Sequence, residues 1–380
     1  MVNISPETTM YSRCCQINEC AACRLAFKTV VYLSNGRKTY KSSCDWSRYY
    51  TAIIDVMALG SRSKLNKDLY EKLYLIRSAE AVIEKHYPED EMKVPMHMSK
   101  GGEAISVGVC HALGENAQIF SSYRSHGIYL ALTEETDEFF AEMYGKTTGM
   151  AKGKAGSMHL SALESGYMGA SAIVASGIPL AVGAAFANKT KNSQRISTVF
   201  LGDGALDEGA FWESLNLACA KKLPVLFVCE DNSFAVHSPA KERHGYESID
   251  DIVSQFDCNV ISENTTDVEV VYNTTLRAIE LLTTGDKPVF LHLHYYRYLA
   301  HVGVKEDFDK GYRSREEFEK WLEIDPVSLQ RKKLLGNGVS ESEIVSIEKQ
   351  IDSQVLKSKE KAQGDSFPDL EELYYGVFTE

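Results

Sequence analysis

Two largely apolar runs in the middle of the chain set the expected fold. Ile196 to Leu201 ends at Gly202-Asp203-Gly204, and Val225 to Cys229 ends at Glu230-Asp231-Asn232. Because both runs are continuous rather than alternating, they predict parallel strands that are buried on both faces of a sheet. The segment between them has a helical pattern. The stretch therefore predicts a βαβ unit whose two polar clusters lie side by side at the carboxyl edge of the sheet.

The flanking segments supply further helices and strands. Leu65 to Tyr87 carries apolar residues at helical spacing, which predicts an amphipathic helix. A small-residue helix is expected over Ala104 to Leu113, and a glycine-rich turn that leads into a buried helix over Gly166 to Ala187. A helix near Thr275 to Thr284 leads into a strand over Lys287 to His294. The pattern predicts one large α/β domain.

The two ends of the chain differ from this domain. Residues 1–63 form an extension that holds five of the nine cysteines, including a C-x-x-C pair at Cys20 and Cys23. These thiolates could bind zinc, or they could be incidental to an accessory hairpin about Asn35-Gly36. Residues 326–380 are charged and helical, which predicts an arm suited to subunit contacts. The main domain is then residues 64–325.

Composition excludes several classes of function. A formal net charge of −12 argues against nucleic acid as a partner, since that would require a basic face. No run approaches the roughly 18 apolar residues of a membrane span. The amino terminus lacks the pattern of a secretory signal, and nine cysteines is an odd number that fits a reducing compartment. We therefore expect a cytoplasmic protein.

The polar residues at the predicted sheet edge indicate a metal and a phosphate. Asp203 and Asn232 offer hard oxygen donors, and Gly202 and Gly204 allow the backbone to approach a phosphate closely. Mg²⁺ usually takes one or two protein oxygens together with phosphate oxygens and water. The alternative is that Gly-Asp-Gly only ends a strand in a turn. Arginine and histidine also follow other apolar runs, within residues 120–127 and 294–303, where they could grip a phosphate.

Six motifs in order give the chain a family resemblance. Gly202-Asp203-Gly204 followed about thirty residues later by Asn232 is the thiamine-diphosphate motif. The supporting stretches are HMSKGGEA from His97, SSYRSHG from Ser121, AKGKAGSMH from Ala151, IPLAVGAA from Ile178, YRYLAH from Tyr296 and YRSREE from Tyr312. The sequence resembles the alpha subunit of the thiamine-diphosphate-dependent first component of 2-oxo acid dehydrogenase complexes, from roughly Lys64 to Glu380.

The resemblance implies a fold, a reaction and partners. It implies a doubly wound parallel sheet of the thiamine-diphosphate-binding fold, with thiamine diphosphate and Mg²⁺ as cofactors. The expected reaction is decarboxylation of a pyruvate-like 2-oxo acid and transfer of the acyl group to a lipoyl carrier. A beta subunit, in an α₂β₂ assembly, and a lipoyl-bearing acyltransferase are the implied partners. The alternative is a decarboxylase, carboligase or acetoin-cleaving enzyme that is not coupled to such a complex.

The family's residue roles transfer to matching positions of this sequence. The resemblance assigns Mg²⁺ to Asp203, Asn232 and the backbone carbonyl of Phe234. It implies two catalytic histidines, with His97 close to the reacting end of the cofactor and His301 near the diphosphate and the substrate channel. Further residues are implied to contact the cofactor, namely Tyr123, Arg124, Ala172, Val174, Gly202, Gly204, Ala205, Asn232, Arg297 and His301.

Three positions depart from the family pattern. Asp231-Asn232 stands where the family usually has two asparagines, and Leu299-Ala300-His301 stands where it has His-Gly-His. Val302 replaces a serine that is phosphorylated in the mitochondrial enzymes, so that switch cannot operate here. These departures suggest a bacterial-type enzyme.

Overall fold

The computed structural model describes the backbone of residues 46–375 and the side chains of residues 62–375. The cysteine-rich segment and its expected hairpin therefore lie outside the described residues. From Leu59 onward the chain forms one compact unit, to which the description below applies.

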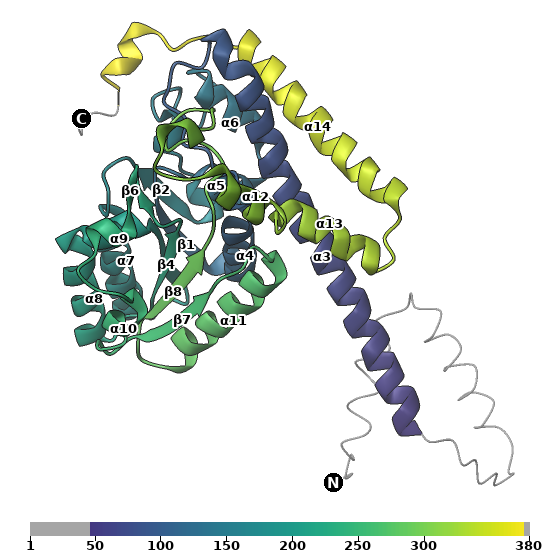
Figure 1. Cartoon of the computed structure of the whole chain (residues 1–380), viewed down its shortest axis with the longest axis vertical. Coiled ribbons are helices and arrows are strands. Elements are labelled where there is room, and N and C mark those ends of the chain that lie inside the picture. Colours follow the sequence, from purple (N-terminus) through teal and green to yellow (C-terminus); the bar gives the residue numbers. More distant parts are fainter. Residues whose placement is uncertain (1–45, 376–380) are drawn as a thin grey trace, which may run out of the picture. The chain divides into compact units, whose positions relative to one another are not determined.

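A parallel sheet organises this unit (Figure 1). Its six strands in the described residues run in the order β2-β1-β3-β4-β8-β7, and every neighbouring pair is parallel. The strands are β1 (Ala117–Ser122), β2 (Tyr167–Ser171), β3 (Ile196–Gly202), β4 (Val225–Asp231), β7 (Asn259–Glu263) and β8 (Val289–His294). The predicted βαβ unit and the α/β class are confirmed.

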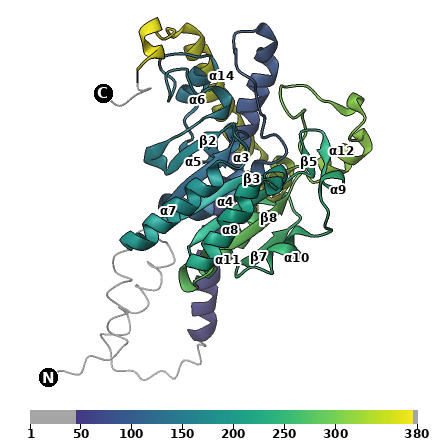
Figure 2. The same ribbon diagram turned by 90° about the vertical axis from the view of Figure 1, so that its left-hand side faces the viewer.

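The strands alternate between two apolar layers. On β4, Leu226 and Val228 join one buried cluster, whereas Phe227 and Cys229 join the other. Helices α4 (Glu103–Leu113) and α11 (Val268–Thr284) pack together on the first face, and α7 (Gly177–Lys191) and α8 (Gly209–Lys221) pack together on the second, where Figure 2 shows them. Such a doubly wound arrangement buries the sheet on both faces. Truncating the fully buried Phe227 to Ala would cost about 3–5 kcal/mol.

The remaining helices and a small ribbon complete the described chain. The helices are α3 (Trp46–His86), α5 (His126–Thr133), α6 (Thr136–Met143), α9 (Ala240–Arg243), α10 (Ile249–Val253), α12 (Arg315–Leu322), α13 (Pro326–Gly336) and α14 (Glu341–Gly364). The antiparallel ribbon pairs β5 (Phe234–Ala235) with β6 (Ser238–Pro239). None of the helices in residues 46–375 is long and apolar enough to cross a membrane.

Two expectations about helices need correction. The carboxyl-terminal arm is helical as predicted, but it is not fully exposed, because Ile344 and Val355 of α14 are buried and Tyr70 of α3 donates a hydrogen bond to Glu348 Oε1 at 2.6 Å. Helix α7 is buried on one side only, since its residues Leu180 and Phe186 are 60% and 52% exposed. Its small residues had suggested burial all round.

The strand β2 was not predicted from the sequence. After Tyr167, the strand consists of Met168, Gly169, Ala170 and Ser171. None of these four residues is β-branched or aromatic, the residue types that are typical of strands. The strand forms because it pairs with β1, with Ile119 opposite Tyr167 and Ser122 opposite Ser171. This pairing places β1 between β2 and β3, where the strand order changes direction.

Candidate active site

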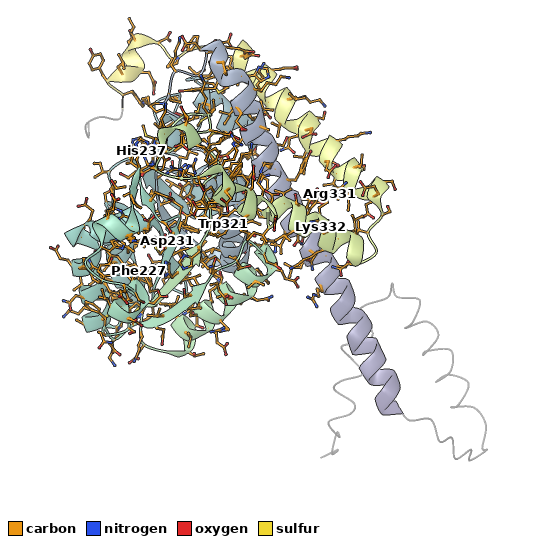
Figure 3. All side chains as sticks on the ribbon, viewed as in Figure 1. Phe227, Asp231, His237, Trp321, Arg331 and Lys332 are labelled. Atoms are coloured by element: carbon orange, nitrogen blue, oxygen red, sulfur yellow. The ribbon has the colours of Figure 1, made fainter. Side chains whose placement is uncertain are left out.

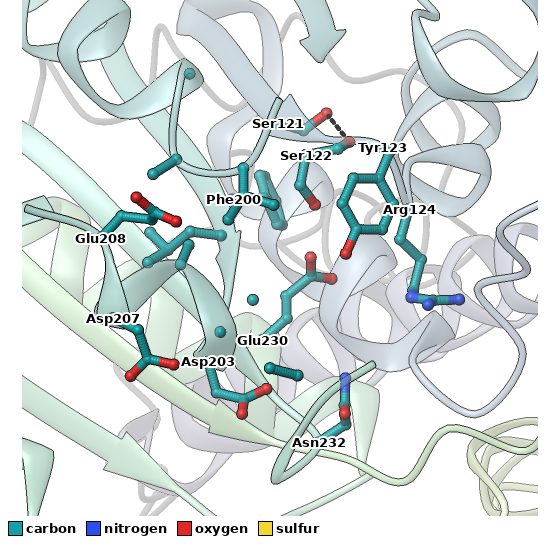
Figure 4. Close-up of a pocket in the computed structure, with 18 of the residues that line it drawn as sticks. Ser121, Ser122, Tyr123, Arg124, Phe200, Asp203, Asp207, Glu208, Glu230 and Asn232 are labelled. Carbon is teal, nitrogen blue, oxygen red and sulfur yellow. Dashed lines mark hydrogen bonds between the residues drawn. The ribbon is translucent and has the colours of Figure 1, made fainter. Parts of the chain in front are cut away.

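A cavity of about 320 Å³ lies at the carboxyl ends of β1, β3 and β4 (Figure 4). It lies beside the point where the strand order reverses, which is where open α/β sheets bind ligands. Ten of the residues assigned from the sequence line it: Tyr123, Arg124, Val174, Gly202, Asp203, Gly204, Ala205, Asn232, Phe234 and His301. The βαβ unit places Asp203 and Asn232 on neighbouring strand ends because β3 and β4 pair directly, with Gly202 opposite Glu230.

Asp203 carries a buried oxygen that lacks a partner. The residue is 2% exposed, and among the described residues no group donates a hydrogen bond to its Oδ1, while its Oδ2 accepts one from Arg243. Burial, and then the charge of Asp231, raise the pKa of Asp203 to about 6, although Arg243 opposes the shift. A buried carboxylate oxygen without a donor is costly unless a ligand satisfies it.

The surroundings of Asp203 fit a small hard cation. The Asn232 side chain is held in place, since its Nδ2 donates to the Tyr295 hydroxyl at 3.0 Å and its Oδ1 accepts from Phe234 N at 3.2 Å. At Gly204 an added Cβ would lie only 2.9 Å from the Cβ of Ala235, so a side chain would crowd the turn. Carboxylate, amide and backbone carbonyl oxygens are the donors that Mg²⁺ prefers.

Arg124, Tyr123 and His301 form another wall of the cavity, and His97 lies behind them. Arg124 is 9% exposed and donates to the backbone oxygens of Met98 at 2.6 Å and His301 at 3.0 Å, which fixes its guanidinium. The Tyr123 ring centroid lies 4.6 Å from that of His97 and 5.7 Å from that of His301. The backbone turn after β1 thus holds a cation and a phenol at the same edge.

Both histidines are neutral near pH 7. Burial, followed by the positive charge of Arg124, lowers the pKa of His97 to about 4 and that of His301 to about 3. Their ring centroids are 5.5 Å apart, and His97 Nδ1 is buried without a hydrogen-bond partner in the described part of the chain. An imidazole in this state can donate or accept a hydrogen bond without carrying charge.

Three residues assigned from the sequence do not line the cavity: His97, Ala172 and Arg297. His97 lies behind Tyr123 and His301, in ring contact with both. Arg297 is 2% exposed, and it donates to the Leu299 oxygen at 3.0 Å and to the Tyr312 hydroxyl at 2.6 Å. Its charge still acts on the site, because it contributes to the lowered pKa of His301.

Two residues of the site were missed by the sequence analysis. Glu230 lines the cavity, and Figure 4 shows its carboxyl group directed inward between Tyr123 and Asn232. Burial raises the pKa of Glu230 to about 8. Its signal was the acidic cluster that ends β4, from which only Asn232 was assigned. Arg243, the partner of Asp203, follows 40 residues after it on the short helix α9, and no motif marks it.

The sequence also matches known proteins. The model of the dehydrogenase E1 component family matches residues 71–371. The alpha subunit of the acetoin:2,6-dichlorophenolindophenol oxidoreductase of Bacillus subtilis is 31% identical over 82% of this chain and 92% of its own length.

Other relatives carry the name of pyruvate dehydrogenase. The E1 component alpha subunits from Porphyra purpurea and Rhizobium meliloti are 31% and 32% identical, over 82% and 81% of this chain and 92% and 88% of their own lengths. The match spans the βαβ unit, the cavity and most of the carboxyl-terminal helices. The chain therefore belongs to the dehydrogenase E1 component family.

Proposed function

We propose that this chain is the alpha subunit of a thiamine-diphosphate-dependent 2-oxo acid dehydrogenase, which decarboxylates a pyruvate-like substrate together with a beta subunit. Family membership makes it an oxidoreductase that acts on an oxo group, with thiamine diphosphate and Mg²⁺ as cofactors. The observation that carries the proposal is the unpartnered, buried Asp203 Oδ1 at a cavity that Asn232 also lines. A buried carboxylate oxygen without a hydrogen-bond donor destabilises the fold, so it is not expected in a chain that binds no cofactor.

In this proposal the chain's residues hold the diphosphate half of the cofactor. Asp203, Asn232 and the Phe234 carbonyl hold Mg²⁺, and Arg124 with the Tyr123 hydroxyl faces the phosphates. Gly202, Gly204 and Ala205 let the backbone come close to them, and Val174, which is 43% exposed at the rim, packs against the cofactor. When bound, thiamine diphosphate supplies the electron sink that decarboxylation requires.

The neutral histidines suit a role in orientation. A pKa of about 3 makes His301 a weak base at pH 7, so it serves better as a neutral hydrogen-bond donor to a substrate oxygen. Burial keeps the His301 ring neutral, and the positive charge of Arg124 adds to this effect. The guanidinium of Arg124 also donates a hydrogen bond to the His301 carbonyl, which fixes the position of that residue. His97 positions His301 through its edge-on ring contact.

A partner chain is part of the proposal. Relatives named as alpha subunits support a beta subunit, and we propose an α₂β₂ assembly that passes its acyl group to a lipoyl-bearing acyltransferase. Ala172, which precedes the lining residues Ile173 and Val174, is proposed as a further cofactor contact. The cytoplasmic location stays a prediction from the sequence.

Acetoin is the second candidate substrate, because the Bacillus subtilis relative is named for it. Buried Leu299 stands where the resemblance expects a histidine, so it removes one polar side chain from the turn that leads to His301. That change alone does not choose between pyruvate and acetoin.

The test is reconstitution of the chain with its beta subunit. The purified pair is assayed with pyruvate, branched-chain 2-oxo acids and acetoin, with a dye acceptor and with an isolated lipoyl domain. Acylation of the lipoyl domain from a 2-oxo acid is the expected result, and the chain alone should be inactive. Dye reduction with acetoin but no lipoyl acylation would favour the second candidate. Decarboxylation at a normal rate by the chain alone would overturn the shared active site.

A further inference from the structure

A second cluster of ligand-type side chains lies on the opposite face of β4 from Glu230. Strand alternation sends Glu230 toward the cavity and Asp231, labelled in Figure 3, toward the α10 side. Asp231 Oδ2 is 2.9 Å from His292 Nε2 and 3.6 Å from His294 Nδ1. Among the described residues this is the one group of three or more His, Cys, Asp or Glu side chains whose ligand atoms all lie within 4.8 Å of one another.

The sheet builds this cluster without strain. His292 and His294 are two residues apart on β8, so both rings leave the same face, and their centroids lie 4.3 Å apart. In the parallel pairing of β4 and β8, Asp231 stands opposite His294 and Cys229 opposite His292. Three side chains from two neighbouring strand ends thus converge on one point.

The spacing matches that of ligands around a transition metal. Metal bonds of about 2.0–2.1 Å place neighbouring ligand atoms roughly 3–3.5 Å apart. The distances of 2.9 and 3.6 Å from Asp231 Oδ2 to the two histidine nitrogens bracket this range. Two imidazoles and one carboxylate are a ligand set that suits Zn²⁺ and other first-row divalent ions.

Asp250 of α10 adds the outer contact that such sites use. Its Oδ1 lies 2.8 Å from His292 Nδ1, the ring nitrogen that faces away from Asp231. A histidine ligand that donates its other ring N–H to a carboxylate is fixed in tautomer and orientation. Asp250, His292 and an ion between His292 and Asp231 would form that arrangement.

The simplest alternative is an ion pair complete in itself, with a protonated His292 between Asp231 and Asp250. That alternative leaves His294 unexplained. Within the described residues the His294 ring makes no hydrogen bond, yet its Nδ1 faces Asp231 Oδ2 at 3.6 Å. Its side chain is 31% exposed, whereas that of His292 is 5% exposed, so His294 stands at the entrance to the cluster.

We propose that Asp231, His292 and His294 bind a divalent transition-metal ion, with Asp250 orienting His292. The ion replaces the protons that the cluster shares in its absence. Asp231 Oδ1 accepts from Ser233 N at 2.6 Å, so the ion also fixes the backbone that leads through Asn232 to Phe234. This site is separate from the proposed Mg²⁺ site and does not depend on the proposed substrate.

The test compares metal retention by the full-length wild-type chain and by His294→Gln. Both proteins are stripped with a chelator, exposed to Zn²⁺ or Co²⁺ in excess Mg²⁺, passed through a desalting column and analysed for metal content. The wild type should retain one equivalent more than His294→Gln, with at least about tenfold weaker binding in the variant. The cysteines of the first 44 residues are identical in both proteins, so any metal they bind cancels in the difference.

Two matched variants locate the ion and guard against misfolding. Asp231→Asn, which places the family's usual residue at this position, should lose the same equivalent while its circular dichroism and thermal unfolding match the wild type. Asp203→Asn should keep it. Equal retention by wild type and His294→Gln, or loss of the extra equivalent in Asp203→Asn alone, would overturn the proposal.

Discussion

The two faces of the β4 end carry opposite kinds of polar cluster. On the cavity face, Asp203 and Glu230 are buried with too few partners, and burial raises their pKa values to about 6 and about 8. On the α10 face, burial opposes the charge of His292, yet the hydrogen bonds that its ring donates to Asp231 and Asp250 raise its pKa to about 9. The carboxylates of the first cluster lack some of their hydrogen-bond partners, whereas most charges of the second cluster are paired within the chain.

This difference follows from what packs against each face. The cavity leaves space beside Asp203 Oδ1, and a ligand must supply the partner that this oxygen lacks, because Arg243 pairs with Oδ2. Helix α10 instead brings Asp250 onto His292, so carboxylates flank the imidazole on both sides. Because side chains alternate along β4, the cavity site, which needs a ligand, and the α10-face cluster, whose charges are mostly paired, lie on opposite faces of the same strand.

Loss of the metal ligand should give the largest effect. Asp203→Ala removes the carboxylate that we assign to Mg²⁺, so Mg²⁺-dependent binding of thiamine diphosphate should weaken by more than about 100-fold, beyond the range for outer contacts of a metal. Isothermal titration calorimetry with and without Mg²⁺ measures this. Glu208→Gln, at the cavity rim, is the control and should bind nearly as well as wild type. Unaltered binding by Asp203→Ala would refute the metal assignment.

In the cofactor-free chain, a change on the α10 face should destabilise the fold more than a change at Asp203. His292→Leu leaves the partly buried Asp231 and Asp250 without their shared cation, which should cost about 2–3 kcal/mol in the free energy of unfolding. Asp203→Asn keeps an amide oxygen that can still accept from Arg243, and Arg243 also keeps its contact with Asp207, so the change should stay within about 1 kcal/mol. Urea unfolding of both variants in metal-free buffer compares them. Comparable losses in the free energy of unfolding for both variants would contradict the proposed difference between the two faces of β4.

A smaller effect should appear on acidification. His97 has a pKa of about 4 in the folded chain, below its ordinary 6.5, so the unfolded chain binds the proton first as the pH falls. The stability that the neutral ring contributes is complete above pH 6.5 and is lost toward pH 4, which amounts to about 2 kcal/mol by pH 5. Urea unfolding at pH 7.5 and 5 should show a shallower loss for His97→Gln than for wild type. Parallel pH profiles would mean that His97 is not held neutral.

Much of the active-site framework was predictable because it depends on local pattern. The apolar runs gave β3 and β4 to within two residues, and their polar ends gave Asp203 and Asn232. Since β4 continues to Asp231, two residues past the predicted end, the inward direction of Glu230 was not anticipated. The family motifs indicated Tyr123, Arg124 and His301, which the fold brings to one cavity.

Tertiary packing alone decided the contacts between distant residues. Arg243 reaches Asp203 across 40 positions, and His292 meets Asp231 across 61 and Asp250 across 42. No periodicity encodes such distances, because they depend on how helices α9 and α10 return to the sheet edge. The local sequence determined that β3 and β4 form and which polar residues end them. The packing of α9 and α10 decided which carboxylate oxygens pair with a cationic side chain of the chain and which remain open to a ligand.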